Sequence, residues 1–212
     1  MGRSKHLMPL EDIKERVLSA VVDLFKYDSD LLDRETNERS ITHKLAEHLQ
    51  RKFPEWNVDC EYNRLFSKTK KISYPTQEII EKITEPIIEI STHKAEKAKS
   101  KKSVAADMAA DTKARTVFPD IIVHKRGRQE NLVVIEVKKR SNRSSKDGDK
   151  EKLKEFTKNE AFQYRLGLLL ILGTLQELAE LKVYAEGKES EDLTKDWERA
   201  LGKKLEVLGY GG

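Results

Sequence analysis

Two segments near the start of the chain have apolar residues at helical spacing. The first, residues 10–27, carries them at Ile13, Val17, Val21 and Leu24. After a polar link at 28–37, the second runs from Glu38 to about Lys52, with its stripe at Ile41, Leu45, Leu49 and Phe53. A stripe of this kind gives a helix one face that packs on a core. We expect two amphipathic helices, the second capped by Asn37 or Thr36, and interpret residues 1–37 as an N-terminal helical extension.

The middle of the chain has the patterns of strands. Residues 57–66 alternate as a half-buried strand does, and residues 118–138 hold two apolar runs around a turn centred on Arg128. Residues 164–173 are predicted to form an apolar strand, with a continuous apolar run from Leu166 to Gly173. A polar loop follows the second apolar run, and Asp149 is a candidate N-cap for a helix through about Ala161. We expect helical or mixed pieces at 174–184 and 192–205.

The predicted hairpin has an electrostatic problem. Side chains two apart share a strand face, so Glu136 and Lys138 point together, away from the core face of Val133, Ile135 and Val137. The register expected from the turn places Asp120 opposite Glu136, with Cβ atoms roughly 5 Å apart. A raised pKa, the Lys138 ammonium or a divalent cation would relieve the repulsion. We favour the cation with the lysine beside it; the alternative is an ordinary exposed hairpin with scattered charges.

Glu38 is a further candidate acid. It lies one turn before Ile41 on the apolar stripe of the second helix, so we expect its side chain to point inward at the helix N-terminus. One interpretation is a first-turn acid that interacts with the helix dipole, worth about 0.3 to 1 kcal/mol. The other is an extra acid of the site formed by the hairpin.

The spacing of these residues carries a family resemblance. Pro119-Asp120, fifteen intervening residues and then Glu136-x-Lys138 resemble the PD-(D/E)XK nuclease superfamily, which includes restriction endonucleases and Holliday junction resolvases. The resemblance spans about residues 38–172. It implies an α/β, restriction-endonuclease-like αβββαβ core, with a central mixed sheet flanked by helices, in a single nuclease-like domain over residues 1–212.

The resemblance also implies roles for the site residues. Asp120, Glu136 and the backbone carbonyl of Val137 would bind Mg²⁺ or Mn²⁺, and Lys138 would position or activate the attacking water. Glu38 would complete the acidic cluster, directly or through a water. These are the expected catalytic and metal-binding residues of a metal-dependent phosphodiester hydrolase.

Charge is unevenly distributed along the chain. The formal net charge is +4, and residues 93–115 alone carry seven Lys or Arg against three acids, while residues 138–158 carry nine against four. Basic charge beside an acidic metal site suits a phosphodiester substrate. The candidate nucleic-acid contacts are Lys139, Arg140, Arg143, Lys99, Lys101 and Lys102; the alternative for each is solvated surface charge.

Residues 67–115 interrupt the expected core. Their Lys-, Ala- and Ser-rich middle has little apolar surface to bury, so we predict an inserted arm, partly helical and partly mobile. Such an arm would lie over DNA or mediate a homodimer; a solvated insertion is the alternative.

Composition limits the class of protein. The single cysteine, Cys60, excludes an intrachain disulfide, and neither a signal-peptide core nor an apolar run of membrane length is present, so we expect a cytoplasmic protein. The favoured function is a Mg²⁺-dependent deoxyribonuclease, an endonuclease rather than an exonuclease. The alternative is a non-catalytic nucleic-acid-binding or assembly module on the same fold, and a third reading is a protein-only interaction domain.

Overall fold

The computed structural model describes most of the chain outside its N-terminus and one long internal segment. The described residues are 8–34, 36–62, 64–65, 68–69, 71–73, 114–158, 160, 162–174 and 179–209. The chain divides into two compact units, one of residues 1–68 with 118–212 and the other of residues 69–117. Most of the predicted arm at 67–115, including Lys99, Lys101 and Lys102, lies outside the described residues.

The second unit contains a short strand pair. Strand β4 (Lys71–Ser73) and strand β5 (Ala114–Thr116) are antiparallel, with Ser73 the partner of Ala114. Two other short strands, β2 (Arg64–Leu65) and β3 (Lys68–Thr69), form a second two-stranded sheet.

The chain begins with two helices. Helix α1 is Leu10–Asp33, so the prediction that a polar link starts at residue 28 is wrong for residues 28–33. The backbone leaves helical geometry only at Asp28, with φ −130° and ψ 24°, and the Asp28 carboxylate is 2.7 Å from Nε2 of the buried His48. Helix α2 is Glu38–Lys52, as predicted, and its Asn37 cap accepts a hydrogen bond from the Ser40 N–H at 2.9 Å.

The main sheet is mixed and six-stranded. Its spatial order is β1 (Asn57–Cys60), β6 (Ile121–Lys125), β7 (Glu130–Lys139), β8 (Leu166–Leu172), β9 (Glu180–Ala185) and β10 (Lys188–Glu189). Strands β7 and β8 are parallel, and the other neighbouring pairs are antiparallel. The predicted α/β class with a central mixed sheet is therefore confirmed.

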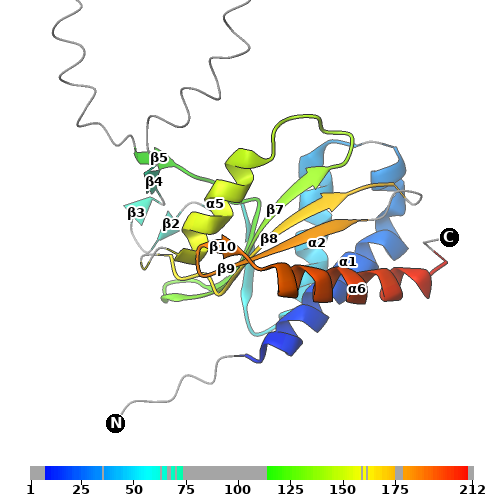
Figure 1. Cartoon of the computed structure of the whole chain (residues 1–212), viewed down its shortest axis with the longest axis horizontal. Coiled ribbons are helices and arrows are strands. Elements are labelled where there is room, and N and C mark those ends of the chain that lie inside the picture. Colours follow the sequence, from blue (N-terminus) through cyan, green and yellow to red (C-terminus); the bar gives the residue numbers. More distant parts are fainter. Residues whose placement is uncertain are drawn as a thin grey trace, which may run out of the picture. The chain divides into compact units, whose positions relative to one another are not determined.

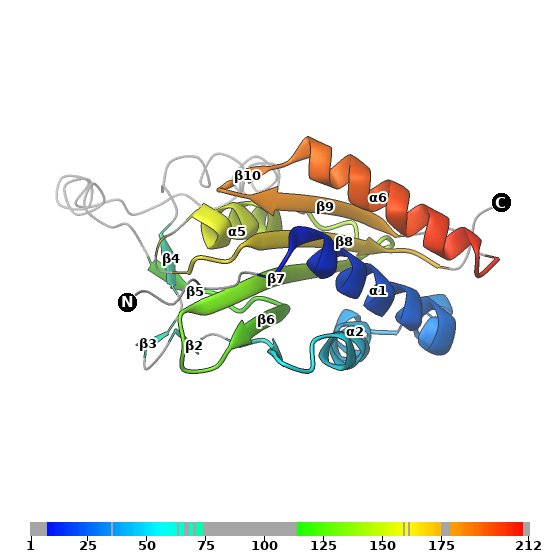
Figure 2. The ribbon, with the colours of Figure 1, turned by 90° about the horizontal axis from the view of Figure 1, so that it is seen from below.

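Helices cover both faces of this sheet (Figures 1 and 2). The core on one face joins α1, α2 and α6 (Glu191–Glu206) to alternate strand residues, among them Val133, Ile135 and Val137. Helix α5 (Asp147–Lys158) packs on β7, β8 and β9 through Leu153 and Phe156. Glu136 alternates with Ile135 and Val137, and so lies on the face that α5 covers. None of the described helices has the length and apolarity needed to cross a membrane.

Two sequence expectations near the site are corrected. Helix α5 begins at Asp147, so Asp149 is a first-turn residue inside the helix and not its N-cap. Residues 180–184, expected within a helical or mixed piece, belong to strand β9 (Glu180–Ala185), in which Leu181, Val183 and Tyr184 are buried.

A glycine in β8 lets α5 approach the sheet closely. A Cβ added at Gly167 would lie 3.2 Å from Cδ2 of Leu153, which is tighter than ordinary van der Waals contact. The contacts at Gly167 come from Leu153 and Thr157, in the second half of α5. On the preceding turns of the same helix, Asp149 reaches Lys138 and Lys152 reaches Glu136.

Candidate functional site

The predicted hairpin forms, and its register brings Asp120 to Glu136. Strands β6 and β7 pair Ile121 with Ile135, and continuing this register by one residue places Asp120 opposite Glu136. The register shift between Val123 and His124 is needed for this pairing, because the register beside the turn, with Lys125 opposite Glu130, would otherwise bring Asp120 opposite Ile135. The Val137 N–H donates to Oδ2 of Asp120 at 2.8 Å, which fixes that carboxylate against β7.

Glu136 is a fully buried carboxylate at the interface of β7 and α5. The Lys152 ammonium of α5 donates to its Oε2 at 2.7 Å. Its other oxygen, Oε1, is buried and has no hydrogen-bond partner among the residues that the structure describes. Burial of a carboxylate oxygen without a hydrogen bond costs folding free energy, so this atom is a candidate for contact with a ligand or an ion.

Lys138 lies between two acids from different helices. Its Nζ is 3.3 Å from Oε1 of Glu38 and 3.3 Å from Oδ2 of Asp149. Asp149 also accepts from Lys152, at 2.8 Å through Oδ1. A continuous line of ion pairs thus runs from Glu38 through Lys138, Asp149 and Lys152 to Glu136.

Glu38 attaches the start of α2 to the end of β7. Its Oε2 accepts hydrogen bonds from the Lys139 N–H at 3.1 Å and from Nδ2 of Asn142 at 3.2 Å. The inward orientation predicted from the apolar stripe places the carboxylate here, next to Lys138. The structure therefore brings Glu38, Asp120, Glu136 and Lys138 to one end of the hairpin, on three different elements.

The protonation properties of the acids follow from burial. Burial raises the pKa of Glu136 well above its ordinary value, and the Asp120 and Asp149 carboxylates add to this effect while Lys152 opposes it. Burial also raises the pKa of Asp120, against the opposing hydrogen bond from Val137 and the charges of Lys138 and Lys152. Both carboxylates hold protons more tightly than they would in water.

The neighbouring carboxylates raise the pKa values of the two lysines, whereas burial lowers them. Burial lowers the pKa of Lys138, but Asp149, Glu38 and Asp120 outweigh it, so the net pKa is raised. For Lys152, Glu136 and Asp149 likewise outweigh burial and raise the pKa. Both side chains are therefore ammonium ions at neutral pH.

The charges of this acidic cluster do not balance. With all groups ionised, the carboxylates of Glu38, Asp120, Glu136 and Asp149 exceed the two ammonium groups by two negative charges. A divalent cation would remove that excess, and carboxylate oxygens are the donors that Mg²⁺ and Mn²⁺ prefer. The unpartnered Oε1 of Glu136 is such a donor. Asp120 and Glu136 thus fit a hard cation in donor type and charge, although no preformed group of three or more metal-ligating side chains is found among the described residues.

Asp149 and Lys152 are functional candidates that the sequence interpretation missed. Their i, i+3 spacing puts both on one helix face, and they pair with each other as well as with Lys138 and Glu136. Acid-to-lysine spacing of this kind occurs repeatedly in α5, for example in Glu151–Lys154, which is exposed. Only the tertiary fold distinguishes the pair that faces the site from the pair that faces water.

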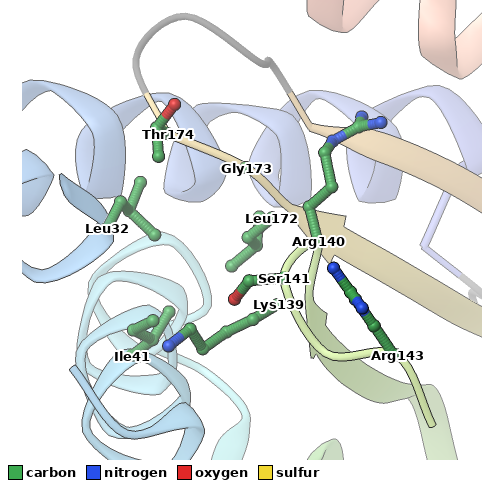
Figure 3. Close-up of a pocket in the computed structure, with 9 residues that line it drawn as sticks. All are labelled: Leu32, Ile41, Lys139, Arg140, Ser141, Arg143, Leu172, Gly173 and Thr174. Carbon is green, nitrogen blue, oxygen red and sulfur yellow. The ribbon is translucent and has the colours of Figure 1, made fainter. Parts of the chain in front are cut away.

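The predicted basic contacts at the end of β7 and in the loop after it line a pocket beside this cluster (Figure 3). Lys139, Arg140 and Arg143 line it. The Lys139 ammonium donates to the Thr36 carbonyl oxygen at 2.9 Å, and the Arg140 guanidinium pairs with Glu180 at 2.8 Å. Cys60 lies apart from this chemistry: burial raises the pKa of its thiol to about 11, which is opposite to the shift of a reactive thiolate.

The chain was compared with known protein families, curated proteins and solved structures. No protein-family model, curated protein or solved structure matches the chain. Functional inference therefore depends on the geometry and charge of the site.

Proposed function

We propose that the protein is a metal-dependent phosphodiester hydrolase that acts on DNA. The observation that carries this proposal is the pairing of two acids with raised pKa, Asp120 and Glu136, in a cluster with excess negative charge and two ammonium groups. Perturbed titratable groups of this kind concentrate at functional sites. The function expected from the sequence resemblance needs the same residues.

The order of elements supports a restriction-endonuclease-like core. Helix α2, strands β1, β6 and β7, helix α5 and strand β8 follow each other as the αβββαβ order requires, apart from the segment between β1 and β6. Within the sheet these strands are neighbours in the order β1-β6-β7-β8. The proposed acids and lysine lie at the start of β6 and near the end of β7, where two helix N-terminal turns converge on them.

Each side chain has a proposed role. Asp120, Glu136 and the Val137 carbonyl oxygen would hold Mg²⁺ or Mn²⁺, an ion that stabilises charge on phosphoryl oxygens and lowers the pKa of a bound water. Because its pKa is raised, Lys138 stays protonated and acts as a cation that orients a water or a phosphate oxygen, not as a general base. Glu38 and Asp149 hold that ammonium in place from two sides.

One observation favours the alternative of a non-catalytic nucleic-acid-binding or assembly module. Lys152 already neutralises part of the charge of Glu136 and Asp149. A lysine in that position could take over the structural task of a cation in a protein that has no use for one. The two functions differ in whether an added divalent cation binds and permits cleavage.

A cleavage assay separates the two functions. Supercoiled plasmid and linear DNA would be incubated with Mg²⁺ and with EDTA, using wild type, Asp120→Ala and Lys138→Ala. Asp147→Ala and Lys154→Ala, exposed charges of α5, serve as matched controls. We expect Mg²⁺-dependent cleavage by wild type and both controls, and loss of cleavage in the two site variants.

The products and failures of this assay are also informative. Nicked circles that precede linear product would indicate one-strand cuts, whereas direct conversion to linear DNA would indicate a homodimer that cuts both strands. Cleavage that survives both site substitutions would refute the assigned residues. DNA binding without cleavage of plasmid, linear DNA or RNA would favour the non-catalytic module, and no salt-sensitive DNA binding would favour a protein-only interaction domain.

A further inference from the structure

A second candidate site lies at the carboxyl ends of the parallel strands β7 and β8. It is a pocket of about 390 Å³, a size at the lower end of the range for small-ligand sites. The described residues that line it are Leu32, Ile41, Lys139, Arg140, Ser141, Arg143, Leu172, Gly173 and Thr174. Lys139 and Leu172 are register partners and the last residues of the two strands. Crevices at the carboxyl ends of parallel strands are recurrent ligand sites in α/β sheets.

The lining of this pocket is suited to an anion. Its described titratable residues are all cationic, namely Lys139, Arg140 and Arg143, and the hydroxyls of Ser141 and Thr174 add polar groups. Figure 3 shows Lys139 extended toward Ile41, while Arg140 points away from it. The Arg140 guanidinium is shared with Glu180 and the Lys139 ammonium donates to the Thr36 carbonyl oxygen, so the Arg143 guanidinium is the cation that we single out here. The guanidinium fork of arginine matches phosphate oxygens in geometry as well as charge.

The pocket and the acidic cluster are joined through consecutive residues. Lys138 and Lys139 point to opposite sides of β7, the first to the cluster and the second to the pocket. Glu38 binds both residues, since it accepts from the Lys138 ammonium and from the Lys139 N–H. Both sites therefore lie at the carboxyl end of β7, where a nucleic-acid strand that passes around this end would meet first one and then the other.

We propose that this pocket binds a phosphate group of the same nucleic-acid strand whose scissile bond lies at the acidic cluster. The identity of the ligand as nucleic acid rests on the proposed function, but phosphate binding itself requires neither metal nor cleavage. The phosphate has two sources, the terminal phosphate of a strand end and an internal diester phosphate. The pocket is a positioning site in both cases.

Anisotropy titrations in EDTA test this pocket without any contribution from cleavage. Two sets of labelled oligonucleotides would be used at one fixed salt concentration, identical except that one set has phosphates and the other hydroxyls at its ends. Arg143→Gln is compared with Arg199→Gln, which removes an exposed arginine from α6. We expect Arg143→Gln to weaken binding about tenfold, as for loss of one charge-assisted contact, and Arg199→Gln to bind as wild type does.

Every outcome decides something about the pocket. If Arg143→Gln binds more weakly only to the oligonucleotides with terminal phosphates, the ligand is a terminal phosphate. If it binds both sets more weakly by the same factor, the ligand is an internal phosphate. Wild-type binding by Arg143→Gln, or equal losses in Arg143→Gln and Arg199→Gln, would overturn the proposal. Cleavage is measured separately with Mg²⁺. If the wild type cuts DNA and Arg143→Gln binds DNA as the wild type does, only the phosphate-pocket proposal is refuted. If the wild type does not cut DNA but Arg143→Gln has lost affinity for the oligonucleotides, only the proposed hydrolase function is refuted.

Discussion

The Lys152 ammonium donates to Oε2 of the fully buried Glu136 at 2.7 Å, so a helix that follows β7 in the chain neutralises a charge inside the sheet interface. Removal of one partner from a buried ion pair leaves the other charge uncompensated. We expect Lys152→Met to lower the free energy of unfolding by about 3 to 5 kcal/mol at neutral pH, measured by urea denaturation. Lys154→Met, which removes an exposed lysine of the same helix, should change it by less than about 1 kcal/mol. Equal effects of the two substitutions would contradict the assignment.

Stability should depend on pH through Glu136. Its pKa in the folded protein is well above the ordinary value of 4.5, so the folded state retains a proton that the unfolded chain releases. In metal-free buffer the free energy of unfolding should therefore be highest below about pH 4.5, as far as this group is concerned, and fall as pH rises through the raised pKa. The glutamine in Glu136→Gln cannot titrate, so the free energy of unfolding of this variant should fall less steeply with pH than that of the wild type. Glu151→Gln, at an exposed position of α5, should follow the wild-type curve.

Divalent cations should stabilise the folded protein. A cation that binds the native acids and not the unfolded chain adds about 2.7 kcal/mol at a hundred times its Kd. We expect MgCl₂ or MnCl₂ to raise the Tm of wild type in thermal denaturation, reversibly with EDTA, beyond the effect of NaCl at equal ionic strength. Asp120→Asn and Glu136→Gln should remove this rise. A rise of equal size in both variants would show that the cation binds elsewhere.

Asp149 should affect cleavage without contacting DNA. Its carboxylate lies between Lys138 and Lys152 and holds both ammonium groups. We expect Asp149→Asn to lower kcat roughly 10- to 100-fold, the usual size for a group that orients a catalytic residue, with little change in DNA affinity. Asp147→Asn removes the other first-turn acid of α5 and so controls for the helix dipole. Asp149→Glu should restore part of the rate if orientation of Lys138 is the cause.

The Asn37 cap should control the position of Glu38. Because Asn37 accepts from the Ser40 N–H at the start of α2, Asn37→Ala should cost about 1 kcal/mol of stability. It should also reduce cleavage, since Glu38 is the next residue and its carboxylate holds Lys138. Asn37→Ser keeps a capping oxygen and should preserve both properties. Loss of stability with an unchanged cleavage rate would separate the cap from the site.

The hairpin part of the site was predictable from sequence because its information is local. Two-residue alternation puts Glu136 and Lys138 on one strand face, as predicted. The pairing beside the turn would by itself bring Asp120 opposite Ile135, and the register shift between Val123 and His124 moves it by one residue to Glu136. The apolar stripe of α2 likewise predicted the orientation of Glu38. Each of these inferences depends on spacing within one element or one turn.

The remaining parts depended on tertiary packing. Asp149 and Lys152 reach the site because α5 crosses from β7 to the parallel strand β8 and packs closely at Gly167. An error of two residues in the helix start made Asp149 seem to be a cap. Strand β9 was missed because Leu181 continues the three-residue spacing of Leu175 and Leu178, which also suits a helix. The pocket beside Lys139 combines four separate segments and has no local signature.

The antiparallel partners Ser73 and Ala114 lie directly before and directly after the long segment 74–113. Residues that face each other across such a pair can be joined by a two-residue turn, so an Asn-Gly dipeptide could replace residues 74–113. The shortened protein should keep its Tm and its metal-dependent cleavage rate. If the predicted arm lies over DNA, the affinity for DNA should fall and depend less steeply on salt, because Lys99, Lys101 and Lys102 are absent. Under the proposed function, this deletion would show whether cleavage needs only the remaining residues and whether residues 74–113 set how long DNA stays bound.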